Sequence, residues 1–350
     1  MKTLKFLIAT VLYYSGILNL FLLVKEKRAG SRKPLILLYH RVIADDDPEM
    51  THSIRGMTTT PEIFKAELNF LKKKFSVISM NNLLKHLEEG TAIPRRSVAI
   101  TFDDGWRDNY LNAFPILKNH EIPATIFITV NLTGTGDKVW FNKAIMIYKA
   151  QKMEPAKIMN IVRSICKDPI PPEELPENIV GFVDMLKPYN NKLIKEVIDQ
   201  LFEASFPAQE KNEFPRNILN WDEIKEMSAA GIEFGSHGMT HGILPLLSKD
   251  DIQWELNESK KQMETNLGIT IDTFSYPNGD YNSDIIDMVK AAGYRCALVT
   301  ETGDKHAYKN LFTIPRVSVH SGASKGPGEN FSKSLFMLKI SGFQNILRGK

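Results

Sequence analysis

Short apolar runs alternate with longer stretches of helical periodicity from residue 34 almost to the end of the chain. Residues 35–39, 98–102 and 124–130 are the clearest apolar runs of the first half, and we predict that they form buried strands. Between them, Thr60 directly before Pro61 predicts the start of a helix, because proline suits the first helical position. Strands that alternate with helices predict a parallel sheet, either open or closed into a barrel.

The second half of the chain repeats this alternation. Asn220 with Glu223 three residues later predicts a helix that begins with a capping box. Ser248 predicts the start of a longer helix that ends at Gly268. The segment 134–216 breaks the pattern, because it is polar, helical and contains a proline cluster, so we predict a helical insertion there. The remaining predicted strands are 232–235, 274–279, 296–300 and 311–319.

The N-terminus carries one uninterrupted apolar run at residues 6–24. As a helix this run would rise ~28 Å, which is close to the hydrocarbon thickness of a bilayer. Lys2 and Lys5 precede it, as in a signal peptide, but no small-residue cleavage site follows it. We therefore expect residues 1–33 to form an uncleaved transmembrane anchor, or an uncleaved signal, with a basic linker.

The C-terminal segment 321–350 also mixes apolar and basic residues. Lys333, Lys339, Arg348 and Lys350 interleave with a helical pattern of apolar side chains. Such an amphipathic tail is typical of a membrane-surface helix. A helix that packs on the globular domain fits the pattern equally well, and Gly342 interrupts it.

Composition excludes several classes of protein. The chain is 43% hydrophobic and 24% charged, which is ordinary for a globular protein and unlike a disordered, collagenous or coiled-coil chain. The net charge of +3 gives no support to a nucleic-acid-binding surface. Cys166 and Cys296 are the two cysteines, so the fold is not a disulfide scaffold.

Three polar segments each follow a predicted strand, at the edge of a parallel sheet where ligands bind. The first contains Asp103 and Asp104, adjacent like charges that a bound cation would relieve. The second contains His237 and His241, which can present two imidazoles to one metal ion. One carboxylate and two imidazoles form the open three-ligand site of catalytic zinc, and the other carboxylate is a candidate general base. The third is the Tyr-Pro-Asn-Gly turn that contains Asn278.

The segments Thr-Phe-Asp-Asp-Gly at 101–105 and Ser-His-Gly-Met-Thr-His at 236–241 resemble those of the polysaccharide deacetylase family, the NodB-homology domain of carbohydrate esterase family 4. The resemblance implies a distorted (β/α) barrel over residues 34–320, interrupted by the helical insertion. It also implies metal-dependent removal of acetyl groups from an N- or O-acetylated glycan. The residue roles that it implies are Asp103 as catalytic base, Asp104, His237 and His241 as ligands of Zn²⁺ (or Co²⁺, Ni²⁺ or Fe²⁺), and the backbone N–H at Asn278 as oxyanion donor.

The chain departs from the usual family pattern at several positions. Gly238 stands where the family has Ser or Thr, and Ser275 stands where the family has the arginine that orients the base. Arg316 is our candidate for the missing guanidinium, because it can pair with Asp103. The late Leu-x-His motif, which supplies the general acid, is also absent in its usual form.

These departures resemble the branch of exopolysaccharide and poly-N-acetylglucosamine deacetylases, which carries an early Tyr-His pair. Here that pair is Tyr39-His40, so His40 is the first candidate for the acid and His320 the second. Two rival hypotheses remain open. The first is a deacylase of peptidoglycan or of a lipid-linked sugar, and the second is an inactive membrane-anchored glycan-binding protein.

A glycan substrate bears on partners and location. The expected partners are an acetylated polysaccharide, the membrane and the exopolysaccharide synthesis machinery, with no nucleic acid. Such a substrate favours a periplasmic or extracellular catalytic domain on a single-pass anchor. The basic cluster after the apolar run argues for the opposite orientation under the positive-inside rule; it consists of Lys25, Lys27, Arg28, Arg32 and Lys33.

Overall fold

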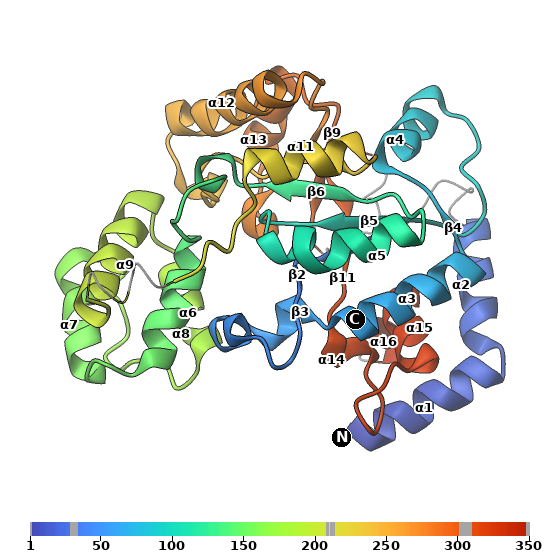
Figure 1. Cartoon of the computed structure of the whole chain (residues 1–350), viewed down its shortest axis with the longest axis horizontal. Coiled ribbons are helices and arrows are strands. Elements are labelled where there is room, and N and C mark those ends of the chain that lie inside the picture. Colours follow the sequence, from blue (N-terminus) through green and yellow to red (C-terminus); the bar gives the residue numbers. More distant parts are fainter. Residues whose placement is uncertain (1, 29–33, 208–209, 211–213, 301–309, 348–350) are drawn as a thin grey trace.

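The computed structural model describes residues 2–28, 34–207, 210, 214–300 and 310–347 of the chain. A parallel sheet forms its centre, helices cover the sheet, and a separate group of helices stands to one side (Figure 1). His306 and four basic residues named above, Arg32, Lys33, Arg348 and Lys350, lie outside the described residues.

The central sheet contains nine short strands in the order β10-β9-β8-β7-β6-β5-β1-β11, with β4 paired to β5. Every pairing is parallel. The strands are β1 (Leu35–Tyr39), β4 (Ser76–Val77), β5 (Ser97–Phe102), β6 (Thr125–Ile128), β7 (Glu233–Ser236), β8 (Thr273–Ser275), β9 (Cys296–Val299), β10 (Ile314–Pro315) and β11 (Val317–Ser318). A two-stranded sheet, β2 (Arg41–Val42) with β3 (Thr58–Thr59), lies beside it.

The two end strands of this order, β10 and β11, are neighbours in the chain. Only Arg316 separates them, while β10 pairs with β9 and β11 pairs with β1. The sheet is therefore nearly closed into a barrel, the form that the family resemblance implied and one of the two that the alternation of strands and helices allowed. Arg316 lies at the seam of this barrel.

Helices begin and end where the cap residues predicted. Thr60 accepts a hydrogen bond from the backbone of Ile63 at the start of α3 (Pro61–Lys74). Asn220 and Glu223 form the predicted capping box of α11 (Trp221–Ala229). Gly268 ends α12 (Lys249–Leu267) in the left-handed conformation. The other helices around the sheet are α4 (Met80–Glu89), α5 (Phe114–Asn119) and α13 (Ser283–Ala291).

The helical segment that follows the Asp-Asp-Gly turn has two parts. A π-helical turn over Asn109–Ala113 precedes α5, and Phe114 donates its backbone N–H to Asn109. Pro115 has no N–H to donate, so the regular hydrogen-bond pattern cannot pass through it. The wider turn still satisfies the neighbouring backbone groups.

The insertion forms its own group of helices. These are α6 (Trp140–Ala150), α7 (Pro155–Ile165), α8 (Ile179–Leu186) and α9 (Asn191–Ser205), and they pack around a separate apolar core. Ala144, Val162, Phe182 and Val197 are fully buried in it. This group stands at the left of Figure 1, apart from the helices that cover the sheet.

The N-terminal apolar run folds as two helices, α1 (Lys2–Tyr14) and α2 (Ile17–Arg28), with a 69° bend between them. Gly16 at the break has a φ of +79°. Among the described residues, no single helix has the length and apolar character of a membrane span; only this bent pair meets that test together.

The C-terminal segment contains α14 (Ser321–Ser324), α15 (Lys333–Ser341) and α16 (Phe343–Leu347). Phe336, Leu338 and Ile340 of α15 are buried, so this helix packs on the body of the molecule. The helix α1 also packs against α15. Of the two alternatives predicted for this segment, the structure therefore supports the helix that packs on the globular domain.

Candidate active site

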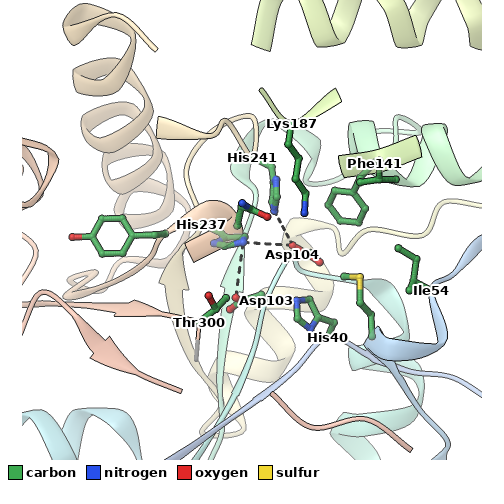
Figure 2. Close-up of a pocket in the computed structure, with 13 residues that line it drawn as sticks. His40, Ile54, Asp103, Asp104, Phe141, Lys187, His237, His241 and Thr300 are labelled. Atoms are coloured by element: carbon green, nitrogen blue, oxygen red, sulfur yellow. Dashed lines mark ion pairs between the residues drawn. The ribbon is translucent and has the colours of Figure 1, made fainter. Parts of the chain in front are cut away.

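A cavity of about 190 Å³ lies where the strands end, and it contains most of the side chains that the sequence singled out. Figure 2 shows the two aspartates, the two histidines and His40 around one space. The cavity is lined by six expected residues, His40, Asp103, Asp104, His237, His241 and Asn278, and by Ile54, Met57, Phe141, Val183, Lys187, Tyr276 and Thr300.

Strand β5 positions the aspartate pair. All six residues of β5 are buried, and Asp103 and Asp104 follow it directly. The chain then turns sharply, with φ of +75° at Asp104 and +77° at Gly105. A Cβ at Gly105 would lie 3.1 Å from the side chain of Ile128, so the turn requires glycine for both space and conformation.

Asp104, His237 and His241 form the candidate metal centre. One potential ligand atom from each lies within 4.8 Å of the others. Oδ1 of Asp104 is 3.5 Å from Nε2 of His237 and 3.3 Å from Nε2 of His241. Burial acts to raise the pKa of Asp104, but hydrogen bonds from both histidines hold that pKa well below its usual value. The carboxylate is thus ionised, as a metal ligand must be.

Contacts behind these three residues orient them. Nδ1 of His237 lies 2.8 Å from the backbone oxygen of Ser275, which directs Nε2 into the cavity. The indole Nε1–H of Trp106 donates to Oδ2 of Asp104 at 2.8 Å and leaves Oδ1 for the histidine side. The guanidinium of Arg41 lies 4.4 Å from the centre of the Trp106 ring. Three oriented N and O donors of this kind fit a divalent transition metal such as zinc.

Glu255 of α12 holds the loop that carries both histidines. Its carboxylate accepts hydrogen bonds from the backbone N–H of Met239 at 2.6 Å and of Thr240 at 3.1 Å. Gly238 has a φ of +78°, and a Cβ there would lie 2.7 Å from Oε2 of Glu255. The departure at Gly238 thus has a physical reason, because the carboxylate fills the space that a side chain would need.

Arg316 reaches Asp103 from the seam of the barrel, as the sequence analysis expected. Its guanidinium donates to Oδ1 at 2.7 Å and to Oδ2 at 2.6 Å, and it also donates to the hydroxyl of Ser275 at 2.8 Å. That hydroxyl donates to Oδ2 of Asp103 at 3.1 Å. Burial acts to raise the pKa of Asp103, but the charge of Arg316 outweighs it and lowers that pKa.

The two candidate acids lie in different places. His40 lines the cavity, and burial lowers its pKa against the opposing charges of Asp104 and Asp103. His320 is not among the residues that line the cavity. Burial, with the charges of Lys339 and Lys5, lowers the pKa of His320. Of the two candidate acids, only His40 therefore lines the cavity that contains the aspartates.

Asn278 lies in a tight turn, Pro277–Gly279, with a φ of +59°. The turn follows β8, and Asn278 lines the cavity beside Tyr276. Its side-chain amide donates to Asp280. The contribution expected of this position is a backbone N–H, which depends on the turn and not on the side chain.

The insertion contributes residues to which the sequence assigned no chemistry. Phe141 of α6 lies with its ring centre 5.2 Å from that of His241. Lys187, which follows α8, extends toward Asp104 and His241 and pairs with Asp184 at 2.8 Å (Figure 2). No local pattern marks these residues, because their place depends on how the insertion docks. Trp106 could have been assigned to the site from the sequence, because it directly follows the Asp-Asp-Gly turn.

A nearly closed parallel barrel with a carboxylate and two imidazoles at its carboxyl edge defines a class of metal-site hydrolases. Residues 91–297 match the family model described as polysaccharide deacetylase, so the chain belongs to the polysaccharide deacetylase family. It is accordingly a hydrolase of the deacetylase type.

Curated relatives are similar over most of their length. The poly-beta-1,6-N-acetyl-D-glucosamine N-deacetylase of Staphylococcus epidermidis is 29% identical over 230 residues, which are 60% of this chain and 74% of that protein. The putative polysaccharide deacetylase YxkH of Bacillus subtilis is 21% identical over 290 residues, which are 83% of this chain and 72% of that protein.

Solved structures share the fold. The Streptococcus pyogenes deacetylase PplD, in complex with acetate, has a TM-score of 0.57 at 19% identity and covers 88% of this chain and 98% of its own. The structure of IcaB from Ammonifex degensii has a TM-score of 0.51 at 17% identity and covers 83% of this chain and 93% of its own. These likenesses support the NodB-type barrel.

Proposed function

We propose that the chain is a metal-dependent N-deacetylase that acts on a polymer of β-1,6-linked N-acetylglucosamine. The observation that carries the chemistry is the shared cavity of Asp103 with the Asp104, His237 and His241 cluster. The substrate follows from the curated relatives, several of which are named as deacetylases of this polymer.

Asp104, His237 and His241 would hold the metal ion, with Zn²⁺ as the first candidate and Co²⁺, Ni²⁺ or Fe²⁺ as alternatives. A divalent ion bound there supplies a Lewis acid that polarises the acetyl carbonyl and acidifies water. Trp106 and the backbone oxygen of Ser275 hold the ligands in orientation, so little rearrangement accompanies binding.

Asp103 accepts the proton of the attacking water. Its carboxylate stays ionised because Arg316 and Ser275 donate three hydrogen bonds to it. The same contacts hold the carboxylate in one orientation inside the cavity, which general base catalysis requires.

His40 donates a proton to the departing amine, and the backbone N–H at Asn278 stabilises the developing oxyanion. Both residues line the cavity beside Asp103. Burial makes the imidazolium of His40 a stronger acid than an exposed one, which favours proton donation. Phe141, Val183 and Ile54 supply apolar parts of the cavity wall.

The test compares acetate release and metal content in purified variants. Asp103→Asn is expected to lower kcat by about 10²- to 10⁴-fold and to retain the metal. His237→Ala is expected to lose both the acetate-releasing activity and the bound metal. His86→Ala, at a site outside the cavity, serves as the control. Full activity in Asp103→Asn would contradict the assignment of the base.

The substrate and the acid are tested separately. Poly-β-1,6-N-acetylglucosamine oligomers are expected to release acetate faster than chitin oligomers or peptidoglycan fragments do. A preference for peptidoglycan would overturn the proposed substrate. His40→Ala is expected to lower kcat while the bound metal is unchanged, whereas His320→Ala is expected to retain the kcat of the wild type. A loss of kcat in His320→Ala but not in His40→Ala would assign the acid to His320.

A further inference from the structure

The N-terminal helices α1 and α2 are apolar on two opposite sides. Their inner sides pack on the body of the molecule, where Ala9 and Leu18 are fully buried. The rings of Phe21 and Phe343 meet at 5.0 Å between their centres, and Thr10 hydrogen-bonds with Ser334 at 3.3 Å. These helices are therefore attached to the catalytic body and are not a free leader in front of it.

The outer sides of the same helices expose large apolar side chains. They recur every three or four residues, so they form one stripe along each helix. The most exposed of them, between 41% and 77%, define what we call the outer face: Leu4, Leu7, Ile8, Val11, Tyr14, Ile17 and Leu20. Soluble surfaces rarely gather apolar side chains in this way, so a patch of this kind marks an interaction site.

The sequence of the two N-terminal helices carries a net positive charge. Residues 1–28 contain five basic residues and one acidic residue, Glu26; the basic residues are Lys2, Lys5, Lys25, Lys27 and Arg28. A net positive charge in an apolar segment suits anionic lipid head groups. The same charges would repel one another if two copies of the chain paired through this face.

We propose that the outer face docks α1 and α2 in the plane of a bilayer that contains anionic lipid, without crossing it. The helix α1 has 13 residues and a length of ~20 Å, which is short of the ~30 Å hydrocarbon core. A span by both helices would require the 69° bend to straighten and the packing on α15 to break. Tyr14, 77% exposed at the bend, suits the head-group level of the membrane.

This mode of docking leaves the catalytic cavity in water. Figure 1 places α1 and α2 at the right of the molecule and the insertion helices α7 and α9 at the left. The cavity is lined by Phe141, Val183 and Lys187 of the insertion. A hydrated polymer can therefore reach the cavity while the opposite side of the molecule rests on the membrane.

The first experiment measures the depth of single cysteine labels in vesicles of phosphatidylglycerol and phosphatidylethanolamine. The native cysteines, Cys166 and Cys296, are buried, so a fluorophore at Leu4→Cys or Tyr14→Cys reports its own site. We expect both labels to shift to the blue and to be quenched by the same shallow brominated lipids. A spanning helix would separate the two labels in depth by ~15 Å, and that result would overturn the proposal.

The second experiment tests the outer face by mutation in the full chain. Leu7→Glu with Val11→Glu is expected to lower vesicle co-sedimentation at least tenfold, and Leu20→Glu gives an independent variant on α2. Trp254→Glu is the matched control, because Trp254 is 46% exposed on α12, outside the outer face. Acetate release from soluble oligomers is expected to stay unchanged in all of them, which shows that they fold.

Two further outcomes would overturn docking. One is undiminished co-sedimentation of both outer-face variants. The other is that the wild-type chain dimerises with rising concentration and does not bind vesicles, and that the outer-face variants abolish the dimer. That result would assign the outer face to a second copy of the chain. Release of the wild-type chain from cell membranes by alkaline carbonate is the expected result for in-plane docking.

Discussion

Asp103 serves as a base only while it is ionised, and its ionisation depends on one buried guanidinium. Arg316 is 1% exposed and contacts both oxygens of Asp103. In the usual family pattern the arginine would come from the position of Ser275. Here the small hydroxyl at that position leaves room for a guanidinium that arrives from the barrel seam.

Arg316→Lys tests this dependence. A lysine ammonium cannot make the paired contact of a guanidinium, so the pKa of Asp103 should rise toward its ordinary value. We expect kcat to fall on the order of 10- to 100-fold, with a smaller change in KM. The acid limb of the kcat profile should move to higher pH, because the carboxylate then takes up a proton more readily. An unshifted limb would contradict this role.

Trp106→Phe tests the orientation of the metal ligand. The change removes only the indole N–H that donates to Oδ2 of Asp104 and retains the ring. We expect the affinity for Zn²⁺ to fall on the order of 10- to 100-fold, measured by competition with a chromophoric chelator. Trp140→Phe, whose Nε1 has no hydrogen-bond partner among the described residues, is the matched control and should retain the affinity.

At the scale of elements, α12 determines the shape of the histidine loop. Gly238→Ser would place a side chain at positive φ and against Glu255. We expect a loss of about 1 to 3 kcal/mol in the free energy of unfolding, together with weaker metal binding. Glu255→Ala in the same chain should restore part of the packing loss but not the hydrogen bonds of the loop. Urea unfolding of the two single variants and the double variant measures this coupling.

The contact between α3 and β1 makes the stability of the chain depend on pH through Glu67. Burial raises the pKa of Glu67 to about 8, and the hydroxyl of Tyr39 donates to its carboxyl group at 2.9 Å. The unfolded chain releases this proton near pH 4.5, whereas the folded chain keeps it to about pH 8. Stability from this group is therefore complete below pH 4.5 and declines as pH rises through that window.

Glu67→Gln keeps a neutral side chain at every pH. We expect it to match the wild type near pH 5 and to exceed it near pH 8.5 by on the order of 3 kcal/mol. Urea unfolding at the two pH values measures the difference. Glu62→Gln, an exposed change on the same helix, should leave the pH dependence unaltered; an equal effect of both changes would rule out burial as the cause.

At the scale of the whole molecule, the proposed metal links two distant segments of the chain, the turn at Asp104 and the loop that carries His237 and His241. Zn²⁺ that binds only the folded state stabilises it by about 2.7 kcal/mol at a hundred times Kd. We expect Zn²⁺ to raise the Tm of the metal-free chain and a chelator to reverse the rise. His241→Ala should show no rise in a thermal scan. A Tm of the wild type that does not change when Zn²⁺ is added would contradict the proposed metal site.

Local elements were the most predictable part of the fold. The caps at Thr60, Asn220 and Ser248 lie at the predicted helix starts, because their side chains satisfy N–H groups only a few residues away. The π-helical turn before α5 was not predicted, because it depends on a missing hydrogen bond at Pro115. The bend in the N-terminal run was not predicted either, because the hydropathy of the run carries no information on the positive φ at Gly16.

The alternation of strands and helices and the residue types that could bind a metal follow from the sequence alone, because both depend on short-range periodicity and side-chain chemistry. Which of these groups meet depends on the tertiary structure. It brought Arg316 across 213 positions to Asp103, and Phe141 and Lys187 from the insertion into the cavity. It also turned one apolar run into two helices with an inner and an outer face. Contacts between distant segments arise from sheet closure and docking, which leave no periodic signal in the chain.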